Sequence, residues 1–256
     1  MANTVLCFLA LVAVSQALPY DLTPRIVHGQ DAKEGEFPYQ VALKYAGIDF
    51  LFCGGSILNE YYVLTAAHCV HGDEPDNMIV IAGVINQKYN NYTHKVEKII
   101  SHEKYNPRDS HVNDIALLKL KTPFEKVQTI KSVPLPSKNE STNEGDKVVV
   151  SGWGTLSSKS KAVPDILQHV DSYIMNQKKC ESLYDEEELF IYETQLCAYD
   201  PKTPKGPCFG DSGGPLTLNG TIVGIVSWGF DCALTDYPTI YTRVSSYLDW
   251  IKEHAV

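Results

Sequence analysis

The chain has little positive charge and no sequence repeats, and its one notable apolar run lies near the start. With 22 Lys and Arg against 31 Asp and Glu, the 256 residues carry a formal net charge of −9, which argues against nucleic acid as a partner. After Val14 no stretch is apolar for long enough to span a bilayer, so we expect no membrane association. No CxxC pair or histidine cluster supports zinc, and no haem, flavin or nucleotide motif predicts a cofactor.

The first residues have the pattern of a processing signal rather than of a folded segment. Val5–Val14 is a short apolar run, and Ser15-Gln16-Ala17 places small residues at the two positions that signal peptidase requires. A membrane helix is the alternative, but the run is short for that role and leads directly into Pro19-Tyr20-Asp21. We therefore predict a signal peptide over residues 1–17 and a secreted, extracellular protein.

The cysteine count is consistent with an oxidising destination. Of the seven cysteines, Cys7 leaves with the predicted signal peptide, and the remaining six form an even number suited to disulfides. Six cysteines allow fifteen pairings, so the sequence alone leaves the connectivity open.

The rest of the chain favours an all-β fold. Its hydrophobic content of 44% is enough for one large or two small cores. Short segments rich in Val, Ile and Tyr recur between turn residues, as at Asn77–Gly83, Lys147–Gly152 and Thr221–Trp228. This pattern predicts a β-barrel or a β-sandwich. Helical periodicity is convincing only near the end, over Val244–His254.

The hexapeptide Gly210-Asp211-Ser212-Gly213-Gly214-Pro215 is the most informative motif. Its glycines permit a tight, exposed turn on which the Ser212 hydroxyl is reachable and nearby backbone N–H groups face an incoming oxyanion. Serine alone is a poor nucleophile, so catalysis also requires a base and an acid that orients it. A passive serine in a glycine-rich turn is the alternative interpretation.

Two upstream motifs supply candidates for the base and the acid. His68 lies in Leu64-Thr65-Ala66-Ala67-His68-Cys69, and histidine suits proton transfer near neutral pH. Asp114 opens the apolar run Ile115–Leu120, where a buried carboxylate needs a partner. Taken singly, His68 could be an ordinary surface group and Asp114 a turn residue that starts a strand. Together with Ser212 they form the set His, Asp, Ser in that chain order.

From Ile26 to its C-terminus the chain resembles the trypsin/chymotrypsin family of secreted serine endopeptidases, and chymotrypsin-like members most. Besides the three motifs above, the resemblance includes Ile26-Val27-His28-Gly29, Phe52-Cys53-Gly54-Gly55-Ser56, Ser151-Gly152-Trp153-Gly154, Ser227-Trp228-Gly229 and Pro238-Thr239-Ile240-Tyr241. The order His–Asp–Ser matches this family rather than subtilisins or α/β-hydrolases. The resemblance implies one protease domain over residues 26–256, with two packed six-stranded antiparallel β-barrels and a C-terminal helix.

The resemblance also implies a mechanism. His68 takes the proton of Ser212 Oγ, Asp114 orients His68, and the N–H groups of Gly210 and Ser212 hold the oxyanion of an acyl-enzyme reaction. Ser227 is expected to add a hydrogen bond to Asp114. The implied disulfides are Cys53–Cys69, Cys180–Cys197 and Cys208–Cys232.

Arg25 followed by Ile26 resembles the activation site of the family. Cleavage there removes a propeptide over residues 18–25 and frees the α-amino group of Ile26 to pair with Asp211. Because losing one partner of a buried ion pair leaves a charge stranded, such a pair can act as a switch. His28 stands where the family usually has glycine.

The pocket implied by the resemblance consists of Gly206, Phe209, Ser227, Trp228, Gly229 and Thr239. Trypsin-like members carry aspartate where Gly206 stands, at the bottom of the pocket. Without a charged residue there, the pocket cannot compensate the positive charge of a buried Lys or Arg side chain. Gly229 leaves the entrance open and Thr239 narrows the interior, so we predict cleavage after Leu, Phe or Tyr. An elastase-like preference for smaller residues is the alternative, and Asp231 near the mouth is the feature that argues for basic residues.

Several further expectations follow. Asn91, Asn139 and Asn219 begin N-glycosylation sequons. The loop Gly83–Val96, where some relatives bind calcium, contains no Asp or Glu, so we predict no metal site. The expected partners are polypeptide substrates, an activating trypsin-like protease and protein protease inhibitors, with the protein itself a monomer of digestive function. A non-catalytic relative that acts as a binding protein is the alternative from another class.

Overall fold

The computed structural model describes residues 26–138 and 140–256. Its first half contains six strands that close into an antiparallel barrel in the order β2-β3-β4-β7-β6-β5. These are β2 (Gln40–Tyr45), β3 (Leu51–Ile57), β4 (Tyr62–Thr65), β5 (Met78–Ala82), β6 (Thr93–Ser101) and β7 (Ala116–Leu120). Two 3-10 turns accompany them, η2 (Ala67–Cys69) after β4 and η3 (Pro75–Asn77) before β5.

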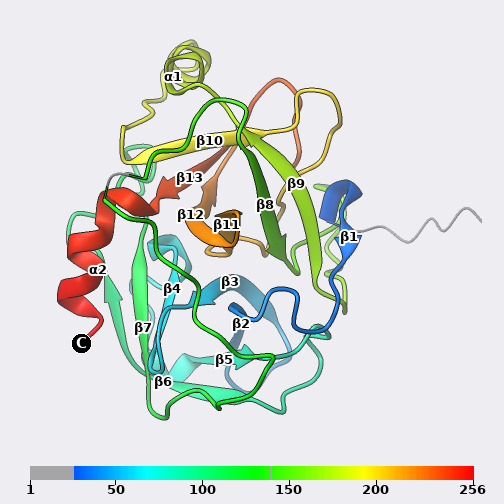
Figure 1. The fold of residues 1–256 in the computed structure, drawn as a ribbon, viewed down its shortest axis with the longest axis vertical. Helices are drawn as coiled ribbons and strands as arrows, with labels where there is room; N and C mark the ends of the chain where they lie inside the picture. Colours follow the sequence, from blue (N-terminus) through cyan, green and yellow to red (C-terminus); the bar gives the residue numbers. More distant parts are fainter. Residues whose placement is uncertain (1–25, 139) are drawn as a thin grey trace, which may run out of the picture.

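The second half forms another antiparallel barrel, in the order β9-β10-β13-β12-β11-β8, which is closed by pairing of β8 with β9. Its strands are β8 (Lys147–Gly152), β9 (Gln168–Ile174), β10 (Gln195–Tyr199), β11 (Pro215–Leu218), β12 (Thr221–Trp228) and β13 (Thr239–Arg243). The short β1 (Gln30–Asp31), which follows the 3-10 turn η1 (Ile26–His28), adds a seventh strand beside β9. The prediction of two six-stranded barrels is confirmed, and Figure 1 shows one barrel above the other.

The helices are few and short. The chain ends in a 3-10 turn, η4 (Val244–Tyr247), and the helix α2 (Leu248–His254), within the range predicted as helical. Tyr247 and Ile251 are buried in the core of the first barrel, so the end of the chain ties the two halves together. Figure 1 shows this red segment beside β7.

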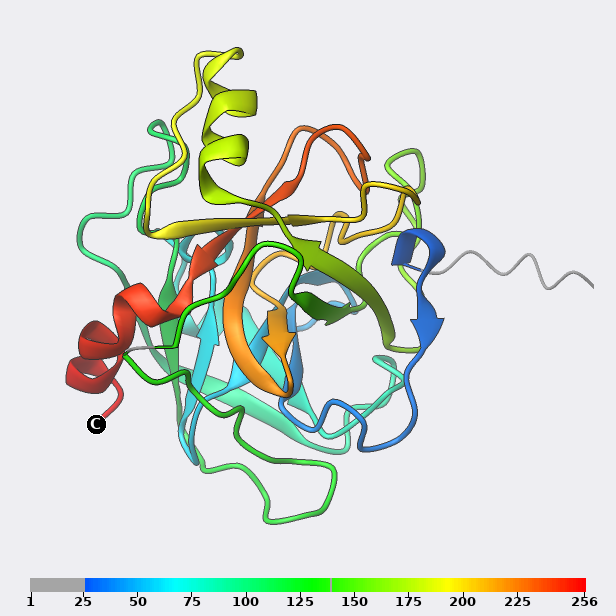
Figure 2. The ribbon, with the colours of Figure 1, turned by 45° about the horizontal axis from the view of Figure 1, so that its top comes forward.

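The helix α1 (Gln177–Asp185), which stands clear of the second barrel in Figure 2, was not anticipated. Only Cys180 and Tyr184 of this helix are buried, so it has too narrow an apolar face for a clear periodic signal. Its start is fixed by Asn176, whose side chain accepts a hydrogen bond from the N–H of Lys179.

Each barrel has its own core of β-branched and leucine side chains that alternate inward along the strands. The predicted strands were close to those observed, since β8 and β12 match their expected bounds and β5 falls within its range. All three predicted disulfides are present, Cys53–Cys69, Cys180–Cys197 and Cys208–Cys232.

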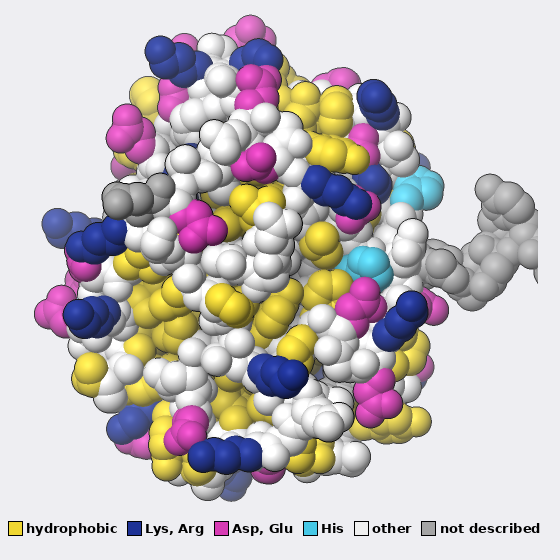
Figure 3. Space-filling model, in the orientation of Figure 1, with side chains coloured by type: hydrophobic (Ala, Val, Ile, Leu, Met, Phe, Trp, Pro, Cys, Tyr) yellow, Lys and Arg dark blue, Asp and Glu magenta, His cyan; other side chains and the backbone are white. Residues whose placement is uncertain are grey.

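The distribution of surface charge and the length of the helices bear on the expected partners. On the face shown in Figure 3, Lys and Arg side chains lie among Asp and Glu side chains, without a broad field of either sign. In residues 26–138 and 140–256, no helix is long and apolar enough to cross a membrane.

Candidate active site

The ends of two neighbouring strands bring His68 and Asp114 together. Thr65, the last residue of β4, pairs with Ala116, the first residue of β7. Because the strands are antiparallel, the residues just after β4 and just before β7 lie at the same edge of the first barrel. His68 lies in η2 directly after β4, and Asp114 precedes β7 by two residues.

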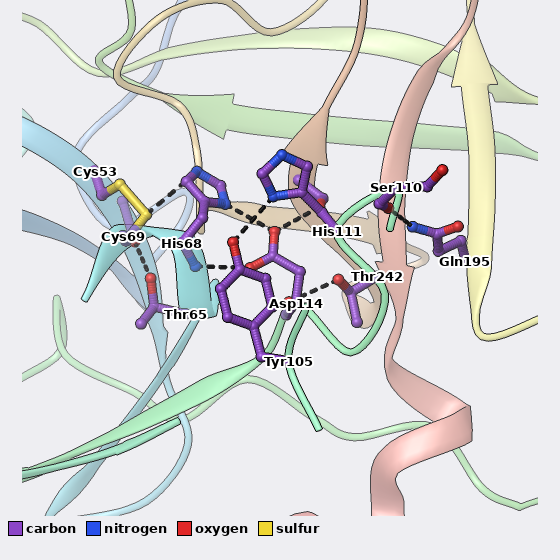
Figure 4. Close-up of polar contacts among 12 residues, drawn as sticks. Cys53, Thr65, His68, Cys69, Tyr105, Ser110, His111, Asp114, Gln195 and Thr242 are labelled. Carbon is purple, nitrogen blue, oxygen red and sulfur yellow. Dashed lines mark hydrogen bonds and ion pairs between the residues drawn. A yellow bond between two sulfur atoms is a disulfide. The ribbon is translucent and has the colours of Figure 1, made fainter. Parts of the chain in front are cut away.

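Asp114 holds His68 by two hydrogen bonds. Its Oδ1 accepts the backbone N–H of His68 at 2.8 Å, and its Oδ2 lies 2.7 Å from His68 Nδ1, as Figure 4 shows. The same Oδ2 accepts a 2.5 Å hydrogen bond from Ser227 Oγ of β12. Burial by itself would raise the pKa of this fully buried carboxyl, but the bonds from His68 and Ser227 outweigh it and hold the pKa below the usual aspartate value.

The second barrel secures Asp114 from the other side. Thr242 Oγ1 of β13 donates to the backbone carbonyl of Asp114 at 2.7 Å, and Ser227 comes from the neighbouring strand β12. The carboxylate therefore lies at the junction of the two barrels, with hydrogen-bond donors from both. The expected bond from Ser227 is present in the structure.

Ser212 reaches the same junction from the second barrel. Gly54 of β3 donates its N–H to the Ser212 carbonyl at 2.8 Å, and Gly213 donates to the Val226 carbonyl at 2.8 Å. Gly213 has a φ of +77°, and a Cβ atom there would meet the Thr65 hydroxyl and come within 2.6 Å of the Gly54 carbonyl oxygen. Glycine is therefore required after Ser212 for the serine loop to pack this closely against the first barrel.

Ser212 borders a cavity, but in the described part of the chain its hydroxyl makes no hydrogen bond to His68. The contact of His68 Nε2 is instead Cys69 Sγ, at 3.8 Å. Catalytic hydrogen bonds often tighten only in the substrate complex. Within residues 26–138 and 140–256 the backbone N–H groups of Gly210 and Ser212 donate to no other group, which leaves both available to a substrate.

Asp211 points inward beneath the serine loop and is fully buried. Its carboxylate oxygens accept the N–H groups of Gly154 at 2.7 Å and Cys208 at 2.9 Å. A Cβ atom at Gly152 or Gly154 would collide with this carboxylate, which explains the two glycines. No cation of the described residues lies against Asp211, and burial raises its pKa to about 7 despite the two hydrogen bonds.

The described residues begin at Ile26, so the predicted signal peptide, the propeptide and Arg25 lie outside them. His28 adopts a φ of +58°, the left-handed conformation that glycine adopts most easily. Its Nδ1 lies 2.8 Å from the carbonyl oxygen of Pro204, in the segment that leads to the pocket. The histidine thus fits where the family usually has glycine.

A cavity of about 170 Å³ opens beside Ser212. It is lined by five of the six predicted pocket residues, Phe209, Ser227, Trp228, Gly229 and Thr239, together with Pro207, Cys208, Val226, Phe230, Asp231 and Cys232. Gly206 is not part of this lining, and a Cβ atom there would lie 3.5 Å from Ala233 Cα. Thr239 lines the cavity, and Asp231 is the one acidic residue among the described residues of the lining.

Three aromatic and imidazole contacts around the site were missed by sequence reasoning. Phe230 lines the cavity and stacks on Tyr184 of α1, with ring centroids 5.1 Å apart. Tyr105 Oη lies 3.0 Å from His111 Nδ1, and the His111 ring stands edge-on to His68 at a centroid distance of 5.9 Å. Phe230 and Tyr184 are far apart in the sequence, as are His111 and His68, so no local spacing indicated these contacts.

The environment of this pair is partly buried. Burial lowers the pKa of His111, an effect opposed by the charge of Asp114 and reinforced by His68. Burial, together with the charge of Asp114, raises the pKa of Tyr105. His111 is therefore a neutral imidazole in the cleft at neutral pH, with Tyr105 uncharged beside it.

Two facing antiparallel barrels, with a histidine–aspartate pair on one and a glycine-flanked serine on the other, define a two-barrel serine protease. The family model described as Trypsin matches residues 26–251. Trypsin-1 of Astacus astacus is 40% identical over 243 residues, which cover 90% of this chain and 100% of that protein. Serine protease 1 of Rattus norvegicus is 36% identical over 253 residues, covering 97% of both chains.

A solved structure agrees with these relatives. Neuropsin, described as a serine protease expressed in the limbic system of mouse brain, matches with a TM-score of 0.81 at 32% identity and covers 90% of this chain and 99% of its own. The chain belongs to the trypsin family of serine proteases.

Proposed function

We propose that this protein is a secreted endopeptidase, made as an inactive precursor, that cleaves peptide bonds after medium-to-large apolar residues. The observation that carries the proposal is the Asp114–His68 pair facing the Ser212 loop, next to a cavity lined mainly by apolar residues. A serine protease acts on polypeptides, so the finer questions concern the roles of these residues, the substrate side chain and activation.

In the proposed reaction, His68 accepts the proton of Ser212 Oγ while that oxygen attacks the scissile carbonyl carbon. The hydrogen bond that His68 Nδ1–H donates to Asp114 holds the imidazole in the tautomer that has its lone pair on Nε2, while the bond donated by the His68 backbone N–H fixes its position. The N–H groups of Gly210 and Ser212 stabilise the oxyanion, a contribution of about 3–4 kcal/mol for a donor in comparable sites. His68 then protonates the leaving amine, and water hydrolyses the acyl-enzyme.

The form of the cavity supports an apolar substrate residue. A buried Lys or Arg side chain requires a compensating carboxylate, and among the described residues that line the cavity only Asp231 is acidic. Asp231 lines the cavity but is itself exposed to solvent, where it compensates a buried cation poorly. Although relatives such as that from Astacus astacus are named trypsins, this chain has Gly206 where the resemblance places the aspartate of trypsin-like members.

The state of Asp211 supports synthesis as a precursor. A buried carboxylate without a cationic partner in the described chain is costly, and a newly freed α-amino group at Ile26 would supply that partner. Since the proposed specificity is apolar, cleavage after Arg25 requires a separate trypsin-like protease. Rapid self-conversion of the purified precursor would contradict this proposal.

Secretion and glycosylation are proposed on chemical grounds. Three disulfides fit an oxidising compartment, and the sequon residues Asn91 and Asn219 are both exposed. The third sequon residue, Asn139, lies outside the described residues.

The proposed catalytic role is tested by labelling the Arg25-cleaved protein with a fluorophosphonate and locating the adduct by mass spectrometry. We expect modification of Ser212, and none in the Ser212→Ala variant. An unlabelled cleaved protein would favour the non-catalytic relative.

Specificity is tested with peptides that differ only at P1, the residue before the scissile bond. Turnover on Leu, Phe or Tyr should exceed that on Arg, whereas the reverse order would overturn the apolar assignment and a preference for Ala would favour the elastase-like alternative.

A further inference from the structure

The 110–114 segment, which leads into β7, has an unfavourable backbone conformation. Ser110, His111 and Asn113 have φ values of +46°, +50° and +60°. Glycine adopts this left-handed conformation easily, but none of the three residues is glycine, so the conformation costs free energy. A conformation of this kind persists only where the surrounding contacts enforce it. The segment therefore depends on its neighbours to hold Asp114 in place.

Two paired residues of the second barrel hold the two ends of this segment. Gln195 and Thr242 are direct partners in the pairing of β10 with β13. Gln195 Nε2 donates to the Ser110 carbonyl at 2.7 Å, and Thr242 Oγ1 donates to the Asp114 carbonyl at the same distance. In Figure 4 both bonds lie on the side of Asp114 away from His68. Because the sheet fixes Gln195 beside Thr242, it also fixes the two ends of the segment relative to each other.

The side chain of Gln195 is itself held in one orientation. It is buried, and its Oε1 accepts the backbone N–H of Tyr192 at 3.0 Å, which leaves Nε2 facing the Ser110 carbonyl. The backbone carbonyl of Gln195 accepts a 2.9 Å bond from Arg243 Nη2. No backbone N–H of the described residues donates to the Ser110 carbonyl, so Gln195 is its partner in that part of the chain.

Two further bonds join the same two parts of the chain. Phe190 donates its backbone N–H to Ser110 Oγ at 3.1 Å, and Tyr192 Oη donates to Asp109 Oδ1 at 2.6 Å. Both of these bonds end on side chains, whereas the bond from Gln195 ends on a backbone carbonyl. Among the three, Gln195 therefore has the most direct control over the path of the main chain towards Asp114.

We propose that Gln195 is a positioning residue for catalysis, which keeps Asp114 where its carboxylate bonds to His68. Gln195 is not among the residues that line the cavity, so it acts through the 110–114 segment rather than on the substrate. Without its bond, the left-handed residues relax and Asp114 moves, which weakens the 2.7 Å contact that selects the tautomer of His68. This inference rests on the proposed function of His68 as the base and of Asp114 as the group that orients it.

Gln195→Met is the main test, because it keeps the length of the side chain but removes the donor to Ser110. The matched control is Gln168→Met. Gln168 is also a buried glutamine, it begins β9 as Gln195 begins β10, and its Nε2 donates to the Ile166 carbonyl at 2.8 Å. Gln195→Ala is the second test if the methionine variant does not fold, since it leaves space for a water molecule to bond the Ser110 carbonyl. Near-ultraviolet circular dichroism identifies the folded variants.

The first measurement follows the proton between His68 Nδ1 and Asp114 by proton NMR, in the activated protein carrying Ser212→Ala. A short hydrogen bond to a charged acceptor moves its proton far downfield of the amide signals. We expect this signal in the parental protein and in Gln168→Met. In both Gln195 variants it should move towards the amide region or be lost by exchange with solvent. An unchanged signal in a folded Gln195 variant would overturn the proposal.

The second measurement is steady-state hydrolysis of an apolar peptide. A displacement of about 1 Å can slow a reaction about 100-fold, so kcat should fall about 10- to 100-fold in Gln195→Met. KM should stay unchanged, because Gln195 does not line the cavity. A purely structural role would lower the Tm and leave the kcat of the folded enzyme unaltered. An unchanged kcat, or an equal loss of kcat in Gln168→Met, would contradict the positioning role.

The two measurements also separate the positioning role from the proposed function. The NMR signal does not depend on hydrolysis, so its movement in the Gln195 variants of a protein that cleaves no peptide would refute the proposed function alone. Hydrolysis with the same kcat in the parental and Gln195→Met enzymes would refute only the positioning role.

Discussion

Ser227 Oγ donates a 2.5 Å hydrogen bond to Asp114 Oδ2, the same oxygen that lies 2.7 Å from His68 Nδ1. The two bonds join β12 of the second barrel to the loop before β7 of the first, and through it to His68. They supply most of the compensation that keeps this fully buried carboxylate ionised. The orientation of the proposed base therefore depends on a residue of the opposite barrel.

Ser227→Ala should accordingly reduce catalysis. A hydrogen bond to a charged group contributes about 1.5–3 kcal/mol, so its loss should lower kcat by roughly 10-fold or more. Steady-state kinetics on an apolar peptide measure the effect. Ser56→Ala is a matched control, because Ser56 is a buried serine of β3 whose hydroxyl has no hydrogen-bond partner in the described chain. An equal loss of kcat in both variants would contradict a specific role for Ser227.

Thr239→Gly should enlarge the substrate cavity. Because Thr239 lines the cavity and Gly206 does not, removing its side chain provides room for larger P1 groups. One methylene group more or less in an apolar pocket changes the discrimination between two substrates by about 1–3 kcal/mol. The ratio of kcat/KM for Phe over that for Val should therefore rise about 10-fold. Thr235→Gly, in the same loop but away from the cavity, should leave that ratio unchanged. A constant ratio in Thr239→Gly would show that this threonine does not limit the substrate.

Gly229→Val should have the opposite effect on size preference. A Cβ atom at Gly229 would meet Thr239 Cα at 3.7 Å and the Asp231 carbonyl at 3.9 Å, which are ordinary contacts, and the φ of Gly229 is not positive. Valine therefore fits the backbone and projects into the cavity mouth. We expect kcat/KM for Phe and Tyr to fall about 100-fold while cleavage after Ala persists, with an unchanged Tm as the sign that the fold is intact.

The sequence predicted the parts of the site that depend on local motifs. The glycines beside Ser212 and the small residues before His68 are required by close packing in the structure, so their identities carry the signal. The strands β8 and β12 were found in full because their Val and Ile content reflects burial within each strand. The resemblance then supplied what spacing could not, namely the disulfide pairing and the bond from Ser227 to Asp114.

The features that were missed are those made by contacts between distant segments. His111 meets His68 only because the loop between β6 and β7, which also carries Tyr105, lies against the segment after β4, and no periodicity in the sequence records that approach. Gly206 was placed at the pocket base by its position relative to Ser212, but whether a backbone segment lines a cavity depends on the side chains in front of it. Here Thr239 is among the residues that line the cavity, and Gly206 is not.

Asp211 provides a prediction about the precursor. In the chain that continues through Arg25, burial raises the pKa of Asp211 to about 7, against an ordinary value of 3.8. Between about pH 4 and pH 7 the folded state retains a proton that the unfolded state has lost, so this group makes the free energy of unfolding decrease as the pH rises. A pKa difference of about three corresponds to a loss of ~4 kcal/mol in the free energy of unfolding, and this loss is complete above about pH 7. Tyr241, the titrating neighbour of Asp211, has a pKa raised by burial and by the Asp211 charge, so it stays neutral throughout this range.

The measurement compares denaturant unfolding of the precursor and of its Asp211→Asn variant from pH 4 to pH 8. Subtracting the free energy of unfolding of one protein from that of the other removes the contribution of every other carboxyl group. We expect the asparagine variant to gain stability relative to the precursor as the pH rises. Asparagine retains one acceptor oxygen, but its amide must face a backbone N–H of Gly154 or Cys208, so this variant should start less stable at low pH. In the Arg25-cleaved protein the α-amino group of Ile26 should lower the pKa of Asp211 and reverse the trend, because the charged carboxylate is then the favoured form. A difference that does not vary with pH in either form would show that Asp211 is not the electrostatic switch of activation.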